Sequence, residues 1–391
     1  MSNALINRSP DLKRLRDEGY TIEIKGGHLI VGDVPYVNSG KEVKIGTFVS
    51  KLDTAGDKAN KPENHVIFFS GEYPCNYDGS KITALEHGSQ TQDLGFGIVV
   101  NHSFSNRPKD GYKDYHEKVS TYIEIVSSQA RVINPKVTAK MFRPISTTDD
   151  ESVFVYEDTS TSRNEIGAVT QKLVGHKIGI VGLGGTGSYV LDFVSKTPVA
   201  EIHLYDGDYF SSHNAFRSPS AASIEELGKL PLKTEYFSHK YSNMHRKVIS
   251  HPIFINKDNV DNLSGLDFIF LCMDVGTVKK VVLEKAEQMN ISFIDVGMGL
   301  HLVENALGGI VRVTTSSPEN RTPFRTKVSF SDDNADNEYN SNIQIAELNA
   351  LNATLAIIKW KKMLGFYHDF DNEHFCAYTV DGNHMLNEDK G

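Results

Sequence analysis

Four closely spaced glycines are the residues of this sequence whose types and spacing point most directly to chemistry. They follow the apolar run 178–181, and an apolar helical pattern resumes soon after them; they are Gly182, Gly184, Gly185 and Gly187. A strand, a glycine turn and a helix in this order hold a nucleotide phosphate at the helix N-terminus, where free backbone N–H groups and the helix dipole favour an anion. The motif therefore predicts a nucleotide site.

The polar loop after the next predicted strand indicates which nucleotide is bound. Gly182, Gly184 and Gly187 also fit the dinucleotide pattern G-x-G-x-x-G, with an aspartate placed to bind a ribose hydroxyl. However, the stretch DGDYFSSHNAFRSP carries four polar residues, Asp206, Asp208, Asn214 and Arg217. A dehydrogenase needs little there beyond an adenosine contact, whereas an ATP-binding enzyme needs cations and amide donors for a triphosphate. The loop favours ATP, with hydride transfer as an alternative.

Together these motifs resemble the ThiF/MoeB and ubiquitin-activating enzyme superfamily. That superfamily has a G-x-G-G-x-G turn, then D-x-D-x5-N-x2-R, then a helical lysine, and an aspartate after the next apolar strand. Here the glycines match the first element, and the polar loop matches the second without a gap. The resemblance implies that Asp206 binds the ATP ribose and that Asn214 and Arg217 bind phosphates, with Gly182, Gly184, Gly185, Gly187 and Asp208 also in the ATP site.

The remaining site residues follow from the same resemblance. The helical lysine is best matched by Lys233, although the segment GKLPLK leaves Lys229 as an alternative. The magnesium-binding aspartate is matched by Asp274 in FLCMDVGTVKK, and the later stretch FIDVGMG is also similar. Arg163, just before the glycine turn, matches an arginine that reaches the γ-phosphate in a neighbouring subunit, which implies a homodimer.

The resemblance implies an adenylation reaction that uses ATP and magnesium. In such enzymes the C-terminal glycine carboxylate of a ubiquitin-like or sulfur-carrier protein attacks the α-phosphate, giving an acyl-adenylate and pyrophosphate. The enzyme positions the reactants and neutralises the growing charge, for which Arg217, Lys233 and Arg163 would supply cations and Asp274 would hold the metal.

The partners are also implied by resemblance. A first domain unlike the ThiF core, joined to a ThiF-like module, resembles bacterial activating enzymes from operons that encode a ubiquitin-like protein, a conjugating-enzyme-like protein and a JAB-type peptidase. Such operons are associated with antiphage defence. The first domain would then be a docking platform. Adenylation of a sulfur carrier or another small substrate is an alternative, as is a catalytically silent heterodimer subunit or adaptor.

The cysteines leave the step after adenylation open. Ubiquitin-activating enzymes usually pass the tail to a cysteine in or near a crossover loop, but the expected loop, residues 314–342, has none. Cys272 lies in an apolar run and is expected to be an inert core residue, and Cys75 is an outside candidate. Cys376 is a weak candidate for a thioester nucleophile, with direct transfer of the adenylate as the alternative.

Composition narrows the class of protein. The chain has 391 residues, enough for two domains, and 39% hydrophobic content, which is typical of a globular protein. The net charge of −9 argues against a nucleic-acid or anionic-membrane surface. The three cysteines form no CxxC pair, so we expect no zinc site and a cytoplasmic location. No run of 18 apolar residues is present, so no membrane partner is expected.

The elements that must position these residues follow from hydrophobic patterns. Apolar runs alternating with helical patterns after residue 176 predict an α/β fold, a Rossmann-like adenylation domain with a mostly parallel sheet. A smaller α+β domain precedes it, with a hairpin at Gly26 and Gly27 and a helix over 114–133. We expect domains at 1–150 and 176–391, joined by a linker and arginine-bearing helix at 151–175. A long helix over 343–364 should bury a stripe of apolar side chains, Ile345, Leu348, Leu351, Leu355 and Ile358.

Overall fold

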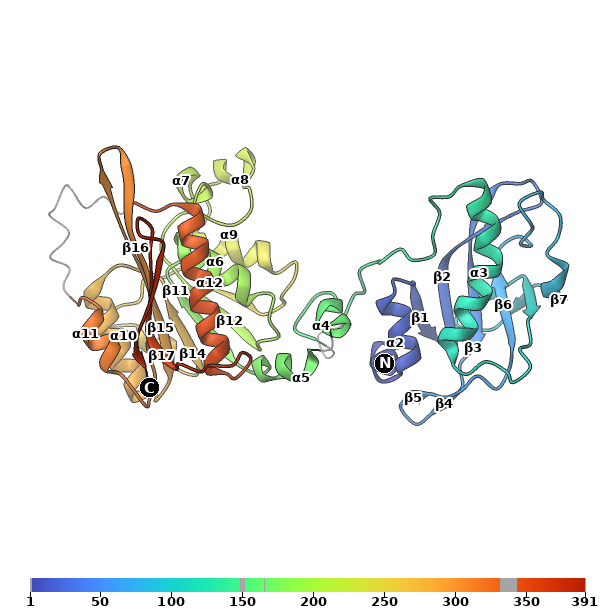
Figure 1. Cartoon of the computed structure of the whole chain (residues 1–391), viewed down its shortest axis with the longest axis horizontal. Helices are drawn as coiled ribbons and strands as arrows, with labels where there is room; N and C mark the ends of the chain where they lie inside the picture. Colours follow the sequence, from blue (N-terminus) through green and yellow to red (C-terminus); the bar gives the residue numbers. More distant parts are fainter. Residues whose placement is uncertain (1, 148–151, 165, 331–342, 391) are drawn as a thin grey trace. The chain divides into compact units, whose positions relative to one another are not determined.

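The computed structural model describes residues 2–147, 152–164, 166–330 and 343–390. Contacts between residues divide the chain into two compact units, residues 1–147 and 148–391, and each unit has its own hydrophobic core (Figure 1). Within the described part of the chain, no helix is long and apolar enough to cross a membrane.

The first unit is a six-stranded antiparallel sheet with helices packed on it. The strand order is β1-β2-β3-β6-β10-β7, and β4–β5 and β8–β9 form separate small hairpins. The helices are α1 (Ser2–Arg8), α2 (Pro10–Asp17), η1 (Thr83–Leu85) and α3 (Tyr115–Ile133). The strands are β1 (Ile22–Lys25), β2 (His28–Val37), β3 (Val43–Lys51), β4 (Thr54–Ala55), β5 (Lys58–Ala59), β6 (Val66–Ser70), β7 (Glu86–Gly88), β8 (Gln92–Asp93), β9 (Val99–Val100) and β10 (His102–Ser105).

Local sequence accounts for the main elements of this unit. The hairpin β1–β2 turns at Gly26 and Gly27, whose φ angles of 54° and 74° suit glycine. Helix α3 begins where the Asp114 side chain accepts a hydrogen bond from the Glu117 N–H. Its predicted apolar face is buried against the sheet, with Val119, Tyr122, Ile123, Val126 and Ala130 in the core. Both predictions are confirmed.

The second unit is built on an eight-stranded mixed sheet of order β13-β12-β11-β14-β15-β16-β17-β18. The first five strands in this order are parallel, as predicted, and the last three join them antiparallel. The strands are β11 (Lys177–Val181), β12 (Glu201–Tyr205), β13 (Val248–His251), β14 (Phe268–Leu271), β15 (Ser292–Val303), β16 (Ala306–Ser316), β17 (Glu373–Thr379) and β18 (His384–Lys390). The hairpin of β15 and β16 extends beyond the shorter parallel strands (Figure 1).

Helices cover both faces of this sheet, because alternate residues of its strands are apolar on each side. Ile178 of β11 and Phe270 of β14 pack in a core with α6, α9 and α12 on one face. Ile269 of β14 and Phe293 of β15 pack with α10 and α11 on the other. The helical segments are α4 (Thr159–Arg163), α5 (Gly167–Thr170), η2 (Gln171–Leu173), α6 (Gly185–Val194), α7 (Ser212–Ala215), α8 (Ile224–Gly228), α9 (Lys233–Tyr241), η3 (Val260–Leu263), α10 (Gly276–Gln288), α11 (Thr322–Lys327) and α12 (Ala346–Met363).

The buried face of α12 differs from the predicted one. The helix exists, but its most buried residues are Asn349, Asn352, Ala353, Ala356, Ile357, Lys359 and Trp360. Leu348, Leu351 and Leu355 are only half-buried, and Ile358 is 38% exposed. Small alanines let α12 approach α6 and the sheet closely, so the leucines flank the contact. The helix was therefore predicted correctly, but the face that it buries was not.

Two further segments depart from expectation. The arginine-bearing segment is three short pieces, α4, α5 and η2, and of its apolar residues Leu173 is buried while Ile166 is 39% exposed. The loop predicted at 314–342 begins later, because residues 314–316 belong to β16 and α11 follows. Its remainder, residues 331–342, lies outside the described residues.

Candidate functional site

The glycine turn lies at the carboxyl end of β11 and leads into α6. Gly182 has a φ of 91°, and a Cβ there would lie 2.5 Å from the carbonyl oxygen of Cys272, the residue that follows β14. A Cβ at Gly187 would overlap the carbonyl oxygen of Gly182, and one at Gly185 would overlap the Asn349 side chain. These glycines therefore allow β11, β14, α6 and α12 to meet at one point.

Gly184 differs from the other three because its Cβ direction is open. The nearest atom there is Oε1 of Gln344, 3.9 Å away. Gly184 is the N-cap residue of the ten-residue helix α6, so the open side of the turn faces the first N–H groups of that helix. Because Gly184 has no side chain, nothing at this position would block a phosphate that approaches from the open side.

A buried aspartate fastens the glycine turn to the polar loop after β12. Oδ2 of Asp206 accepts a hydrogen bond from the Leu183 N–H at 2.7 Å, and Oδ1 accepts one from the Asp208 N–H at 2.9 Å. The side chain of Asp206 is almost fully buried. Its carboxylate thus fixes the position of the glycine turn relative to the loop after β12.

Lys233 joins this cluster and Lys229 does not. Nζ of Lys233 lies 2.7 Å from Oδ2 of Asp208 and 3.5 Å from Oδ2 of Asp206. The backbone explains this, since Tyr209 and Leu232 form an antiparallel bridge and the Lys233 N–H donates to the Asp208 carbonyl at 2.9 Å. Lys229 is the exposed C-cap residue of α8. The structure therefore places Lys233, and not Lys229, beside Asp206 and Asp208.

Asn214 and Arg217 carry buried donors without protein acceptors. Oδ1 of Asn214 accepts a hydrogen bond from the Ser211 N–H at 3.0 Å, which orients the amide. Within the described part of the chain, nothing accepts a hydrogen bond from Asn214 Nδ2 or Arg217 Nε, although both atoms are buried. A buried donor without an acceptor raises the free energy of the folded protein. An anion that accepted hydrogen bonds from these two groups would remove that cost. The two residues fit a phosphate ligand.

Asp274 lies on the turn between β14 and α10, and its side chain is exposed. Val275 is the N-cap residue of α10, and Asp274 directly precedes it. The same turn contacts the glycine turn, since a Cβ at Gly182 would lie 3.3 Å from Cβ of Met273. Among the described residues, no group of three or more His, Cys, Asp or Glu side chains is arranged to hold a metal.

Two side-chain arrangements at this edge of the sheet were not predicted from the sequence. In the first, Thr186 Oγ1 donates a hydrogen bond of 2.8 Å to Oδ1 of Asn349, and within the described residues Nδ2 of Asn349 has no acceptor. The signal was present, because Asn349 and Asn352 interrupt an apolar helical pattern with a spacing of three. Helix α12 therefore contributes a buried amide directly behind the glycine turn.

The second arrangement is a buried ion cluster centred on Asp295. This side chain is fully buried, with Oδ1 2.8 Å from Nζ of Lys279 and Oδ2 2.8 Å from a guanidinium nitrogen of Arg312. Lys279 is in the first turns of α10, so the pair fixes the start of that helix and the turn bearing Asp274. The signal in the sequence was an aspartate inside the apolar run FIDVG.

Family models divide the chain between residues 159 and 160, twelve residues after the boundary between the two units. Residues 10–159 match a domain of unknown function (DUF6791), and residues 160–381 match the ThiF family, which is more than half of the chain. The chain belongs to the ThiF family. The glycine turn, the Asp206 loop, Lys233 and Asp274 all lie inside the ThiF match, and no curated protein matches the chain.

Solved structures similar to this ThiF protein share little sequence with it. MccB of E. coli with succinimide is 18% identical, covers 60% of this chain and 72% of its own, and has a TM-score of 0.47. MccB of E. coli with ATP is 18% identical over 57% and 66%, with a TM-score of 0.46. Selenomethionine PaaA is 14% identical over 83% and 95%, with a TM-score of 0.48.

Four residues remain from the sequence prediction, an arginine and three cysteines. Arg163 ends α4, and its side chain lies outside what the structure describes. Burial raises the pKa of the thiols of Cys75, Cys272 and Cys376 above its ordinary value. Because only the thiolate is a strong nucleophile, none of the three cysteines is activated by its surroundings.

Proposed function

We propose that this ThiF protein uses ATP to adenylate the C-terminal glycine carboxylate of a ubiquitin-like protein. The observation that carries the proposal is the pair of buried, unsatisfied donors on Asn214 and Arg217. They lie on the loop that Asp206 fastens to the glycine turn, so one edge of the sheet offers backbone N–H groups, an amide and two cations to one anion. A triphosphate fits this donor set better than a nicotinamide dinucleotide does.

The proposed reaction needs no proton transfer from the enzyme. The glycine carboxylate is already an anionic nucleophile, so its oxygen forms a bond to the α-phosphorus while the bond to the bridging oxygen breaks and pyrophosphate leaves. Asn214 would bind phosphate oxygens, and Arg217 and Lys233 would neutralise the charge that grows on the α-phosphate and the leaving group. In this state Lys233 exchanges Asp208 for phosphate, because the side chain of Asp208 is exposed and its carboxylate can be solvated by water instead.

Magnesium would be held by Asp274. One exposed carboxylate is enough for Mg²⁺ when phosphates and water supply the other ligands, which agrees with the lack of a three-residue cluster among the described residues. When bound, the metal neutralises charge on the phosphates. The structural role of Asp295 and Lys279 is to hold α10 so that Asp274 stays beside the glycine turn.

The adenylate is proposed to pass directly to a conjugating-enzyme-like partner. The raised pKa of Cys376 and of the other two thiols disfavours a thioester on this chain. The first unit would dock the ubiquitin-like protein or the conjugating-enzyme-like protein, in a bacterial antiphage pathway. The partner's nucleophile would then attack the acyl carbon and release AMP.

A homodimer with Arg163 acting in the neighbouring site is part of the proposal. An Arg163→Ala subunit mixed with an Asp274→Ala subunit should recover activity, because one of the two sites in the hybrid then has both residues intact. Subunit exchange is followed with two affinity tags. Exchange without recovery would place Arg163 in its own subunit's site or outside the site.

Exchange of labelled pyrophosphate into ATP tests the function. The assay is run with magnesium and with candidate small proteins that end in glycine, added one at a time, and a truncated partner lacking its last glycine is the control. We expect exchange only with an intact partner. If exchange occurred only with a sulfur-carrier protein, the substrate would be that carrier and not a ubiquitin-like protein. If no carboxylate partner supported exchange and the protein did not bind ATP, a catalytically silent subunit would be favoured. Tighter binding of NAD than of ATP in calorimetry would contradict adenylation.

A further inference from the structure

A cavity in the ThiF unit lies at the edge of the sheet where the parallel strands begin. It has a volume of about 460 Å³. Its walls come from the turns that precede the parallel strands, with Leu173 before β11, Pro198 before β12 and Met244 before β13. The candidate ATP site instead follows the carboxyl ends of the same strands. The cavity is therefore separate from the site described above.

The outer wall of the cavity is formed by the segment around Phe154, which is hydrogen-bonded to the rest of the ThiF unit. The Val155 N–H donates to the Met244 carbonyl at 2.8 Å, and the Arg246 N–H donates to the Val153 carbonyl at 2.8 Å. The Phe154 ring packs edge-on against the buried His245 ring, with centroids 5.8 Å apart. These contacts hold the segment against the body of the unit, so the cavity has a built wall rather than a loose flap.

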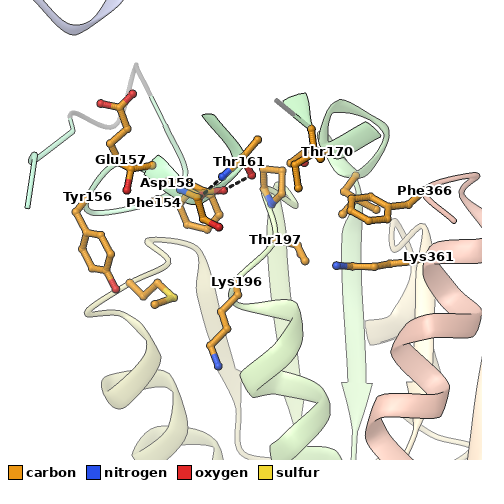
Figure 2. Close-up of a pocket in the computed structure, with 16 residues that line it drawn as sticks. Phe154, Tyr156, Glu157, Asp158, Thr161, Thr170, Lys196, Thr197, Lys361 and Phe366 are labelled. Atoms are coloured by element: carbon orange, nitrogen blue, oxygen red, sulfur yellow. Dashed lines mark hydrogen bonds between the residues drawn. The ribbon is translucent and has the colours of Figure 1, made fainter. Parts of the chain in front are cut away.

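The lining is mainly apolar, with a few hydroxyl groups. Phe154, Leu173, Pro198, Met244 and Phe366 supply hydrophobic surface, and Thr161, Thr170 and Thr197 lie around it (Figure 2). The size and the mixture of apolar wall and few polar groups are typical of small-molecule sites. Such a lining selects a ligand with an apolar body.

Lys361 brings an unpaired positive charge to this lining. Figure 2 shows Lys361 on one side of the cavity beneath Phe366, and Nζ lies 4.5 Å from the Phe366 ring centroid. Within the described residues, no carboxylate pairs with Lys361. Burial lowers the pKa of Lys361 below its ordinary value, as expected for an ammonium group removed from water without a counterion.

The other charges at the cavity are already engaged or distant. Nζ of Lys196 lies 2.6 Å from Asp192. The Asp158 carboxylate accepts hydrogen bonds from the Ser160 N–H and the Thr161 N–H, each at 3.0 Å. Glu157 lies on the side opposite Lys361 (Figure 2). Among the described residues that line the cavity, Lys361 is therefore a cation without a carboxylate partner.

We propose that this cavity binds an apolar carboxylic acid, with its carboxylate on Lys361 and its hydrocarbon part between Phe154, Leu173 and Met244. The ammonium regains the counterion that the protein does not provide, and the apolar walls are covered. The proposal is independent of nucleotide binding, since no residue of the cavity belongs to the ATP site. The bound acid bridges α12 and the segment that precedes the glycine turn.

Three probes separate the contributions in the full-length protein. Octanoate carries both chain and carboxylate, 1-octanol carries only the chain, and acetate only the carboxylate. Binding is measured by calorimetry and by saturation-transfer NMR. We expect octanoate to bind more tightly than octanol and acetate. Lys361→Gln should weaken octanoate binding by about tenfold to a hundredfold, the usual range for a hydrogen bond to a charged group, while octanol binding stays the same.

Two further variants keep the test decisive. Lys280→Gln, an exposed lysine on α10, is the matched control and should not change octanoate binding. Thr170→Trp should fill the cavity and abolish binding of both long-chain probes. Circular dichroism during thermal unfolding checks that each variant is folded. Equal affinity of octanoate and octanol, unchanged octanoate binding in folded Lys361→Gln, or binding that survives Thr170→Trp would each overturn the proposal.

Discussion

The backbone N–H of Leu183 donates a hydrogen bond of 2.7 Å to Oδ2 of Asp206, and this contact joins the glycine turn to the polar loop after β12. The same carboxylate also accepts the Asp208 N–H and lies 3.5 Å from Nζ of Lys233. A single buried side chain thus sets the spacing between the segment that would face the phosphates and the segment that would face the ribose.

Asp206→Asn should lower the free energy of unfolding of the second unit by about 3 kcal/mol, because a buried N–H loses its acceptor and Lys233 loses a charged partner. Urea unfolding followed by the fluorescence of Trp360, the single tryptophan, measures this. Asp258→Asn, at an exposed position on a loop, is the control and should have no effect. A loss below about 1 kcal/mol, the range of a neutral hydrogen bond, would show that the contact does not hold the loop.

Asp274→Ala should leave stability unchanged, because the side chain is exposed, and should reduce pyrophosphate exchange on the order of a hundredfold to a thousandfold. The reason is the loss of the carboxylate proposed to hold magnesium beside the triphosphate. Binding of metal-free ATP should not weaken, since one negative charge near the phosphates is removed. Asp258→Ala is the matched control, and exchange at the wild-type rate in Asp274→Ala would remove the metal assignment.

Asp295→Asn should destabilise the second unit by about 3–5 kcal/mol, because Lys279 is left buried beside a neutral amide. The double variant Lys279→Met with Asp295→Leu should recover part of this loss, since the two most buried charges are removed together and only the more exposed Arg312 loses its partner. Urea unfolding followed by Trp360 fluorescence compares the three proteins. If the double variant were as unstable as the single one, packing rather than charge would explain the effect.

Lys118 predicts a pH dependence in the first unit. Its Nζ is buried and donates to Ser50 Oγ and the Asn64 carbonyl, and burial lowers the pKa of Lys118 to about 8. Below about pH 8 the amine is protonated in both the folded and the unfolded chain, so the burial penalty is complete. Between about pH 8 and 10.5 only the unfolded chain keeps the proton, so stability should rise with pH by up to about 3 kcal/mol.

Lys118→Met provides the comparison for this pH dependence. The difference in unfolding free energy between wild type and Lys118→Met should change across that pH range, while Lys136→Met, an exposed control, should follow wild type. Scanning calorimetry of the full chain measures both. A difference that stays constant from pH 7 to 10.5 would mean that Lys118 titrates at its ordinary pKa.

Much of the ThiF unit could be predicted from sequence because the signals are local. A near-continuous apolar run such as that of β14 has to be buried on both sides, which requires a parallel sheet with helices on each face. Likewise, a positive φ at Gly182 and the close approach at Gly187 permit only glycine, so the turn is visible in the residues themselves. The roles of these residues in catalysis stay predictions until exchange is measured.

Other features could not be predicted because they depend on which surfaces meet. The stripe of leucines on α12 suggested one buried face, but the approach of Ala353 and Ala356 to α6 selected another. The sequence matched Lys233 best but left Lys229 as an alternative, and the backbone bridge between Tyr209 and Leu232 brings Lys233 to Asp208.

The sequence by itself determined the order of elements, the glycine turn and the polar loop, because each depends on residues close along the chain. Only the tertiary structure decided that Asp295 pairs with Lys279, and that Lys361 faces a cavity with no counterion among the described residues. Burial and charge pairing are properties of groups brought together from distant positions. A side chain's type states its charge, but only its surroundings decide whether that charge is neutralised or left for a ligand.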